Sequence, residues 1–155
     1  MSPELLRTLF DVNHQVLHRN VSGLTHEESL IQPPEGGNCL NWVAGHIVAT
    51  RNGLLKLLGE DPIWSPEEEA VYKRGSKPIQ NESRAKPFPS ILADYDRSQE
   101  RLRAGISRLT EAAMKESRGD GTLGGTLHIL HFHEAYHIGQ TAILRRMAGK
   151  EGAIP

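Results

Sequence analysis

Two histidines four residues apart lie in an apolar stretch near the end of the sequence. His133 and His137 share one face of a predicted helix with Leu130, Thr141 and Leu144, because residues at i and i+4 lie one above the other. This face is predicted to point into the core. Buried imidazoles need partners, so the pair indicates either a hydrogen-bonded polar network or a bound metal ion. The stacking of two imidazoles favours the metal.

A third histidine, His46, lies on the shoulder of an apolar stripe in an earlier predicted helix. Thr50 and Gly53 follow one and two turns later and leave space beside it, while Asn41 and Trp42 can close one end of a pocket. Three neutral imidazoles leave open positions on a divalent ion, which is typical of a catalytic rather than a closed structural site. Nickel, zinc, iron and copper all suit such ligands.

Other histidines are predicted to lie outside this site. His14 and His18 also form an i, i+4 pair able to chelate a metal, but their helix face is predicted to be solvated. We therefore interpret them as surface residues. His128 and His131 point away from the inner stripe of their helix by roughly 100° or more, and are not expected to be ligands.

The segment from His133 to His137 also matches the H-E-x-x-H pattern of zinc proteases, in which the glutamate is the general base. The longer form of that pattern needs a glycine and a further histidine where this sequence has Gln140 and Ile143. No strand that could align a peptide is predicted, so the protease is a minor alternative. Glu134 is predicted to orient a histidine or a water molecule, or to be a partly exposed helix residue. Gln140 is predicted to hydrogen-bond a metal ligand.

Helical periodicity and capping signals predict four long amphipathic helices. A short helical turn after Thr25 and a short helix starting at Ser65 are also predicted, the latter inside a proline-rich connection from Pro62 to Pro89. No strand is predicted. The long helices are expected at residues 2–23, 38–59, 90–115 and 122–147. These elements predict an all-α four-helix bundle with one long crossover connection, which is expected to line the entrance to the site.

Composition limits the function further. The chain of 155 residues has a formal net charge of −1, which suits a single domain over 1–155 and gives no bulk attraction to nucleic acid or anionic membranes. No apolar run approaches the roughly 18–20 residues of a membrane span. The single cysteine, Cys39, and the absence of a signal peptide predict a cytoplasmic location. Cys39 itself is interpreted as a buried or capping thiol without a chemical role.

Two segments resemble the DinB/YfiT-like superfamily of bacterial metal-binding four-helix bundles. They are NWVAGHI at residues 41–47 and HEAYHIGQ at residues 133–140. The resemblance implies that His46, His133 and His137 bind one divalent ion, which in this family is often nickel, zinc, manganese or iron. It also implies a homodimer, since homodimers are common among such proteins.

The same resemblance implies a reaction class. Characterised members are transferases and isomerases that depend on a low-molecular-weight thiol such as bacillithiol or mycothiol. Iron-dependent sulfoxide synthases of ergothioneine synthesis use a related bundle, but carry a glutamate where this chain has Gly139. The leading hypothesis is therefore a metal-dependent S-transferase acting on a thiol and an electrophile. A non-enzymatic metal-binding or stress-associated protein and a metal-dependent hydrolase are the alternatives. No catalytic residue is assigned beyond the metal ligands.

Overall fold

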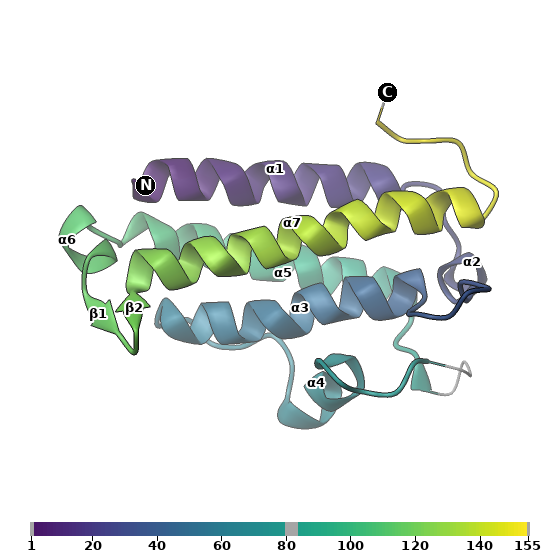
Figure 1. Ribbon diagram of the computed structural model, residues 1–155, viewed down its shortest axis with the longest axis horizontal. Helices are drawn as coiled ribbons and strands as arrows, with labels where there is room; N and C mark the ends of the chain where they lie inside the picture. Colours follow the sequence, from purple (N-terminus) through teal and green to yellow (C-terminus); the bar gives the residue numbers. More distant parts are fainter. Residues whose placement is uncertain (1, 80–83, 155) are drawn as a thin grey trace.

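Helices dominate the computed structural model, which describes residues 2–79 and 84–154 (Figure 1). The elements, in chain order, are α1 (Pro3–Val21), α2 (His26–Ser29), α3 (Leu40–Leu57), α4 (Pro66–Tyr72), α5 (Phe88–Ser107), α6 (Glu111–Met114), β1 (Ser117–Arg118), β2 (Gly121–Thr122) and α7 (Leu123–Met147). The prediction of an all-α fold is confirmed. Within the described ranges, no helix combines the length and apolar character that crossing a membrane requires.

The four long helices form a bundle with two pairs of parallel helices. Helices α1 and α7 run in one direction, and α3 and α5 run in the other (Figure 1). Helix α1 packs against α5 and α7, and α3 packs against the same two helices. Because α3 and α5 are parallel, the chain must return along the bundle between them, and residues 58–87 make this return. The predicted long crossover is therefore a consequence of the topology, and its helix α4 packs on α3.

Capping interactions define where most helices begin. Ser2 accepts a hydrogen bond from the backbone N–H of the first turn of α1, and Thr122 does the same for α7. Thr25 and Ser65 form complete capping boxes with glutamates three residues later, and each begins a short helix where one was predicted. Beyond the end of α3, Gly59 adopts a φ of +73°, which glycine tolerates better than other residues.

The predicted third long helix, 90–115, is wrong after Ser107. Helix α5 ends at Ser107, and a separate turn, α6, begins after Thr110, whose Oγ1 accepts from the N–H of Ala113. A threonine can offer its side chain to the backbone in this way and so favours a new helix start. Residues 119 and 120 form a turn between β1 and β2, an antiparallel pair of two-residue strands, where no strand was predicted.

A polar layer divides the apolar core into two clusters. One cluster contains Leu17, Val48, Ile91 and Ile138, and the other contains Phe10, Leu54, Leu102 and Leu127. Each long helix contributes to both clusters, with a buried polar residue between its two contributions. These buried polar residues are Asn13, Arg51, Ser98 and Glu134.

An ion pair between Arg51 and Glu134 forms the centre of this layer. Arg51 Nε lies 2.8 Å from Glu134 Oε2, and Arg51 Nη2 lies 2.8 Å from Glu134 Oε1. The remaining guanidinium nitrogen donates to Ser98 Oγ at 2.8 Å and to the carbonyl oxygen of Tyr95 at 3.3 Å. The two side chains are 1% and 4% exposed. The bidentate geometry compensates for the removal of both charges from water.

Removal of one charge from this pair should strongly destabilise the fold. Glu134→Gln keeps the shape of the side chain but leaves the Arg51 guanidinium buried and unpaired, so the free energy of unfolding should fall by about 3 kcal/mol or more. Urea denaturation followed by circular dichroism measures this change. The control Glu100→Gln, at an exposed position of α5, should change stability by less than about 0.5 kcal/mol. Equal losses in the two variants would contradict a central role for the ion pair.

Candidate metal centre

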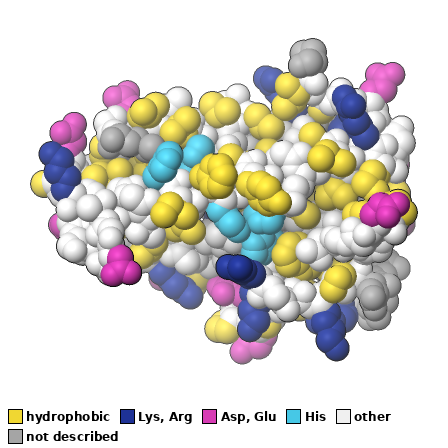
Figure 2. All heavy atoms as spheres, viewed as in Figure 1, with side chains coloured by type: hydrophobic (Ala, Val, Ile, Leu, Met, Phe, Trp, Pro, Cys, Tyr) yellow, Lys and Arg dark blue, Asp and Glu magenta, His cyan; other side chains and the backbone are white. Residues whose placement is uncertain are grey.

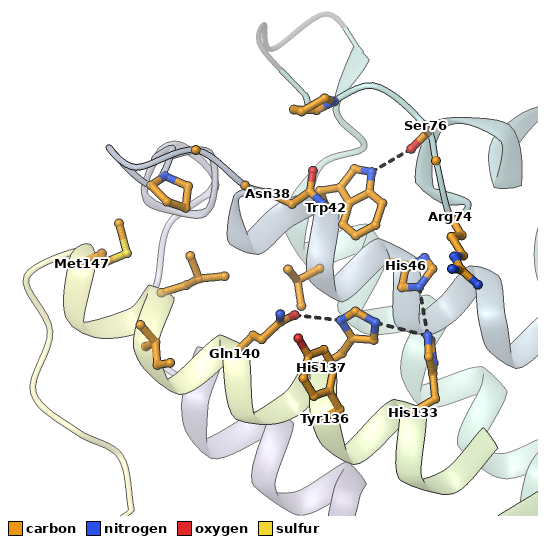
Figure 3. A pocket seen from close by; sticks show the side chains of 18 residues that line it. Asn38, Trp42, His46, Arg74, Ser76, His133, Tyr136, His137, Gln140 and Met147 are labelled. Atoms are coloured by element: carbon orange, nitrogen blue, oxygen red, sulfur yellow. Dashed lines mark hydrogen bonds between the residues drawn. The ribbon is translucent and has the colours of Figure 1, made fainter. Parts of the chain in front are cut away.

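Three histidines from two helices meet at the groove between α3 and α7. His46 Nε2 lies 3.3 Å from His133 Nε2, which lies 3.2 Å from His137 Nε2 (Figure 3). The three ligand atoms all lie within 4.8 Å of one another. Metal–nitrogen bonds of about 2.0–2.1 Å would place neighbouring ligand nitrogens about 2.9–3.4 Å apart. The two measured distances fall in this range.

Hydrogen bonds at the other ring nitrogens orient two of the imidazoles. His46 Nδ1 lies 2.7 Å from the carbonyl oxygen of Tyr72, which can only accept, so the proton of the neutral ring is on Nδ1. His137 Nδ1 lies 2.8 Å from Gln140 Oε1 (Figure 3), and donates to it in the same way. The interaction predicted for Gln140 is therefore present. Both Nε2 atoms consequently direct a lone pair toward His133.

His133 lacks the hydrogen bonds that would satisfy its ring without an ion. Its Nδ1 is buried and has no hydrogen-bond partner among the described residues. A single proton on its Nε2 could serve only one of the two lone pairs that His46 and His137 direct at it. With its proton on Nδ1 instead, His133 directs a third Nε2 lone pair at the same point, and a cation shared by the three Nε2 atoms would satisfy these three lone pairs. The donor set therefore fits one divalent metal ion.

Burial keeps the three imidazoles in the form that binds metals. Loss of hydration lowers the pKa of His46 to about 4, although the hydrogen bond to Tyr72 acts in the opposite direction. Burial is also the largest cause that lowers the pKa of His133 and of His137. All three rings are thus neutral at pH 7, and no proton must be removed before an ion binds.

Two aromatic residues hold the His46 ring in place. Trp42 stacks on it with ring centroids 4.7 Å apart and an interplanar angle of 10°, and its Nε1 donates to Ser76 Oγ at 2.9 Å (Figure 3). Tyr72, which sequence analysis missed, supplies the carbonyl oxygen from the end of α4. Asn41 does not close the pocket as predicted, because its buried amide contacts the Tyr72 hydroxyl at 3.1 Å.

Gly45 allows the close approach of α4 to α3. A Cβ atom at this position would lie 2.2 Å from Cδ1 of the Tyr72 ring, far inside van der Waals contact. Any larger residue must therefore displace Tyr72, and with it the carbonyl that orients His46. Gly45 directly precedes His46 in the sequence, and a glycine at this position could have indicated that another segment packs closely beside the histidine.

The substitution Gly45→Ala should weaken metal binding without removing a ligand. Displacement of Tyr72 should disturb the ring orientation of His46, and loss of such an orienting contact typically costs about 10- to 100-fold in affinity. Competition with a chromophoric chelator measures the dissociation constant. Gly139→Ala is the matched control, because a Cβ there would meet no atom within 4 Å. An unchanged affinity in Gly45→Ala would show that Tyr72 does not position the ligand.

The position of Glu134 does not suit the general base of a zinc protease. Its carboxylate points into the core, where it pairs with Arg51 and accepts from the Tyr95 hydroxyl at 3.3 Å. It does not line the pocket above the histidines. Its negative charge acts to raise the pKa of His133, but less than burial lowers it. Neither predicted role of Glu134 is observed, because the residue is buried and its hydrogen bonds to described residues go to Arg51 and Tyr95 rather than to a histidine.

A pocket of about 870 Å³ opens above the three histidines. Hydrophobic side chains surround the histidines on this face of the molecule (Figure 2). The crossover contributes Arg74, Gly75, Ser76 and Pro78 to the lining, in agreement with the predicted role of this connection. Arg74 is exposed, and no ion pair joins it to another described residue. Its guanidinium is therefore available to a ligand in the pocket.

The two histidines predicted to point away from the site do so. His128 is exposed, and the ring of His131 packs edge-on against Phe10 with centroids 5.3 Å apart. Cys39 is fully buried at the start of α3, and burial raises the pKa of its thiol. This environment suits the inert role predicted for the cysteine.

The sequence profile of the DinB superfamily matches residues 9–141. The chain therefore belongs to the DinB superfamily. No curated protein matches the sequence at a significant level. Membership in this family and the three-histidine group in the α3–α7 groove are together compatible with a metal-binding protein.

Each of the three histidines should be required for tight metal binding. The native protein should retain about one equivalent of a transition metal after gel filtration, whereas His46→Ala and His137→Ala should retain close to none, because two imidazoles hold an ion far less firmly than three. Elemental analysis by mass spectrometry measures the content. His128→Ala, an exposed histidine on the same helix, serves as the control. A metal content that is undiminished in both ligand variants would exclude this centre.

Proposed function

We propose that the protein is a metal-dependent S-transferase that uses a low-molecular-weight thiol. The observation that carries this proposal is the convergence of three neutral imidazoles at the wall of an open pocket, with no protein carboxylate among the donors. When bound, a divalent ion in such a site would supply Lewis acidity and lower the pKa of a thiol.

The pocket offers separate contacts for a charged thiol and for an apolar electrophile. Arg74 presents a positive charge at the pocket wall that forms no ion pair with another described residue, and it can hold a carboxylate of a cysteine-derived thiol there. Val43, Leu144 and Met147 line the same pocket and provide an apolar surface for an electrophile. Gln140 accepts from His137 through its amide oxygen, so its amide N–H₂ group can donate to a bound substrate.

The transfer itself needs no redox partner. The thiol loses its proton to solvent, its sulfur forms a bond to an electrophilic carbon, and the leaving group departs with the bonding electron pair. Within the described ranges, the pocket lining contains no cysteine or serine that is paired with a base as a nucleophile. The thiol substrate would therefore be the nucleophile, and the residues of the pocket would bind and orient it.

A thiol titration of the cobalt-loaded protein tests the proposal. Addition of a cysteine-derived thiol should produce a sulfur-to-cobalt charge-transfer band, and monochlorobimane should then be converted to its fluorescent thioether. His137→Ala should show neither signal. A metal-loaded protein that shows no thiol band and forms no thioether would instead be a non-enzymatic metal-binding protein. Thiol-independent hydrolysis of an ester would favour the hydrolase.

Comparison of two thiols tests the role of Arg74. Arg74→Ala should raise the KM for N-acetylcysteine, which carries a carboxylate, by about tenfold, the typical effect of losing a charge-assisted hydrogen bond. It should leave the KM for the uncharged 2-mercaptoethanol unchanged. Lys77→Ala, a nearby exposed cation that does not line the pocket, should affect neither thiol. Equal effects of Arg74→Ala on both thiols would contradict recognition of the carboxylate.

A further inference from the structure

A second group of metal-ligand side chains lies at the groove between α1 and α5. His14 Nε2 lies 2.7 Å from Asp96 Oδ1, and His18 Nε2 lies 2.6 Å from the same oxygen. All three ligand atoms lie within 4.8 Å of one another. The interpretation of these two histidines as plain surface residues is therefore incomplete, because a carboxylate from a neighbouring helix joins them.

Their place on α1 explains why the helix period alone does not reveal this group. The buried face of α1 includes Phe10, Asn13 and Leu17, and the two histidines lie beside this face, where α5 packs against α1. The side chains of His14 and His18 are 22% and 37% exposed. They are thus partly covered, while part of each side chain remains accessible to solvent.

The buried ring of Tyr95 packs against one imidazole of this group. The His14 ring stacks on the Tyr95 ring, with centroids 5.1 Å apart and an interplanar angle of 21°. Tyr95 is fully buried, and its ring lies 3.9 Å below the guanidinium carbon of Arg51. The central ion pair therefore supports one imidazole of the group, which limits the conformational entropy that ion binding would remove.

Asp96 supplies a negative charge, and its side chain is free enough to change conformation when a cation binds. Its side chain is 50% exposed, and its second carboxylate oxygen has no hydrogen bond to a described residue. The two nitrogen–oxygen distances are shorter than the roughly 2.9–3.4 Å between two ligands of one ion. Because the Asp96 side chain is half exposed, its rotation can lengthen both distances to the separation that two ligands of one ion require.

We propose that His14, His18 and Asp96 form a second divalent-cation site that joins α1 to α5. Two imidazoles and one carboxylate on neighbouring helices form a donor set that zinc, cobalt and iron accept, with further positions left for water. The site differs from the three-histidine centre, because its carboxylate neutralises part of the ionic charge. It does not depend on the proposed S-transferase activity.

The site should bind more weakly than the three-histidine centre, since it is open to water and its carboxylate must move. Its ion would act as a cross-link between two helices, so binding should stabilise the folded chain by mass action. No contact joins the two ion positions directly. Each can therefore be titrated in a variant that lacks the other.

Zinc titration calorimetry in the His46→Ala background tests this site separately. The single variant should still bind one equivalent of Zn²⁺, and its melting temperature should rise with zinc concentration. Addition of Asp96→Asn should weaken this binding by at least tenfold, because the amide cannot replace the charged ligand. Asp120→Asn, an exposed aspartate in the β1–β2 turn, is the matched control and should leave the affinity unchanged.

Two results would overturn the proposal. One is the absence of zinc binding in His46→Ala at concentrations well above those that fill the three-histidine centre of the native protein. The other is binding that Asp96→Asn leaves intact, which would indicate an exposed histidine pair acting without the carboxylate. Circular dichroism of each variant checks that the helices are retained, and His18→Ala provides a second variant that removes a ligand without altering Asp96.

Discussion

The ion pair between Arg51 and Glu134 fixes the relation of α3 and α7, the two helices that carry the three-histidine group. Arg51 follows His46 on α3 by little more than one turn, and Glu134 directly follows His133 on α7. A bidentate contact tolerates little sliding or rotation of one helix against the other. The register that pairs these charges is thus also the register that brings the Nε2 atoms of His46 and His133 to 3.3 Å. An apolar contact of the same area would specify this register less strictly.

The polar layer built on this ion pair lies between two grooves whose metal-ligand side chains differ in charge. Around the bundle each long helix has two neighbours, so the α3–α7 groove and the α1–α5 groove are opposite each other. In the first groove all ligands are neutral, and an ion there would keep its full charge and attract an anionic partner. In the second groove Asp96 offsets part of that charge. Tyr95 connects the two sides, since its hydroxyl donates to Glu134 and its ring stacks on His14.

The sequence allowed prediction of features that depend on one helix or on a shared motif. The period of α7 places His133 and His137 on one face, and capping residues such as Ser65 mark helix starts, so these could be read without knowledge of the packing. Arg51 and Tyr72 could not be found in this way, because their partners come from segments distant in the chain. The interpretation of His14 and His18 as plain surface residues was incomplete for the same reason, because Asp96 comes from another helix. Whether a helix face is solvated depends on the helix that packs beside it, which periodicity does not identify.

The crossover shows how topology and chemistry depend on each other in this bundle. Parallel α3 and α5 require a long return connection, and such a segment must pack somewhere on the bundle. Here α4 packs closely on α3 because Gly45 has no side chain to oppose Tyr72. That contact delivers a backbone carbonyl to Nδ1 of His46, and the residues that follow place Arg74 at the wall of the pocket. The segment that the topology demands thus both orients a ligand and supplies the charge that a substrate would meet, so a shorter connection would remove both.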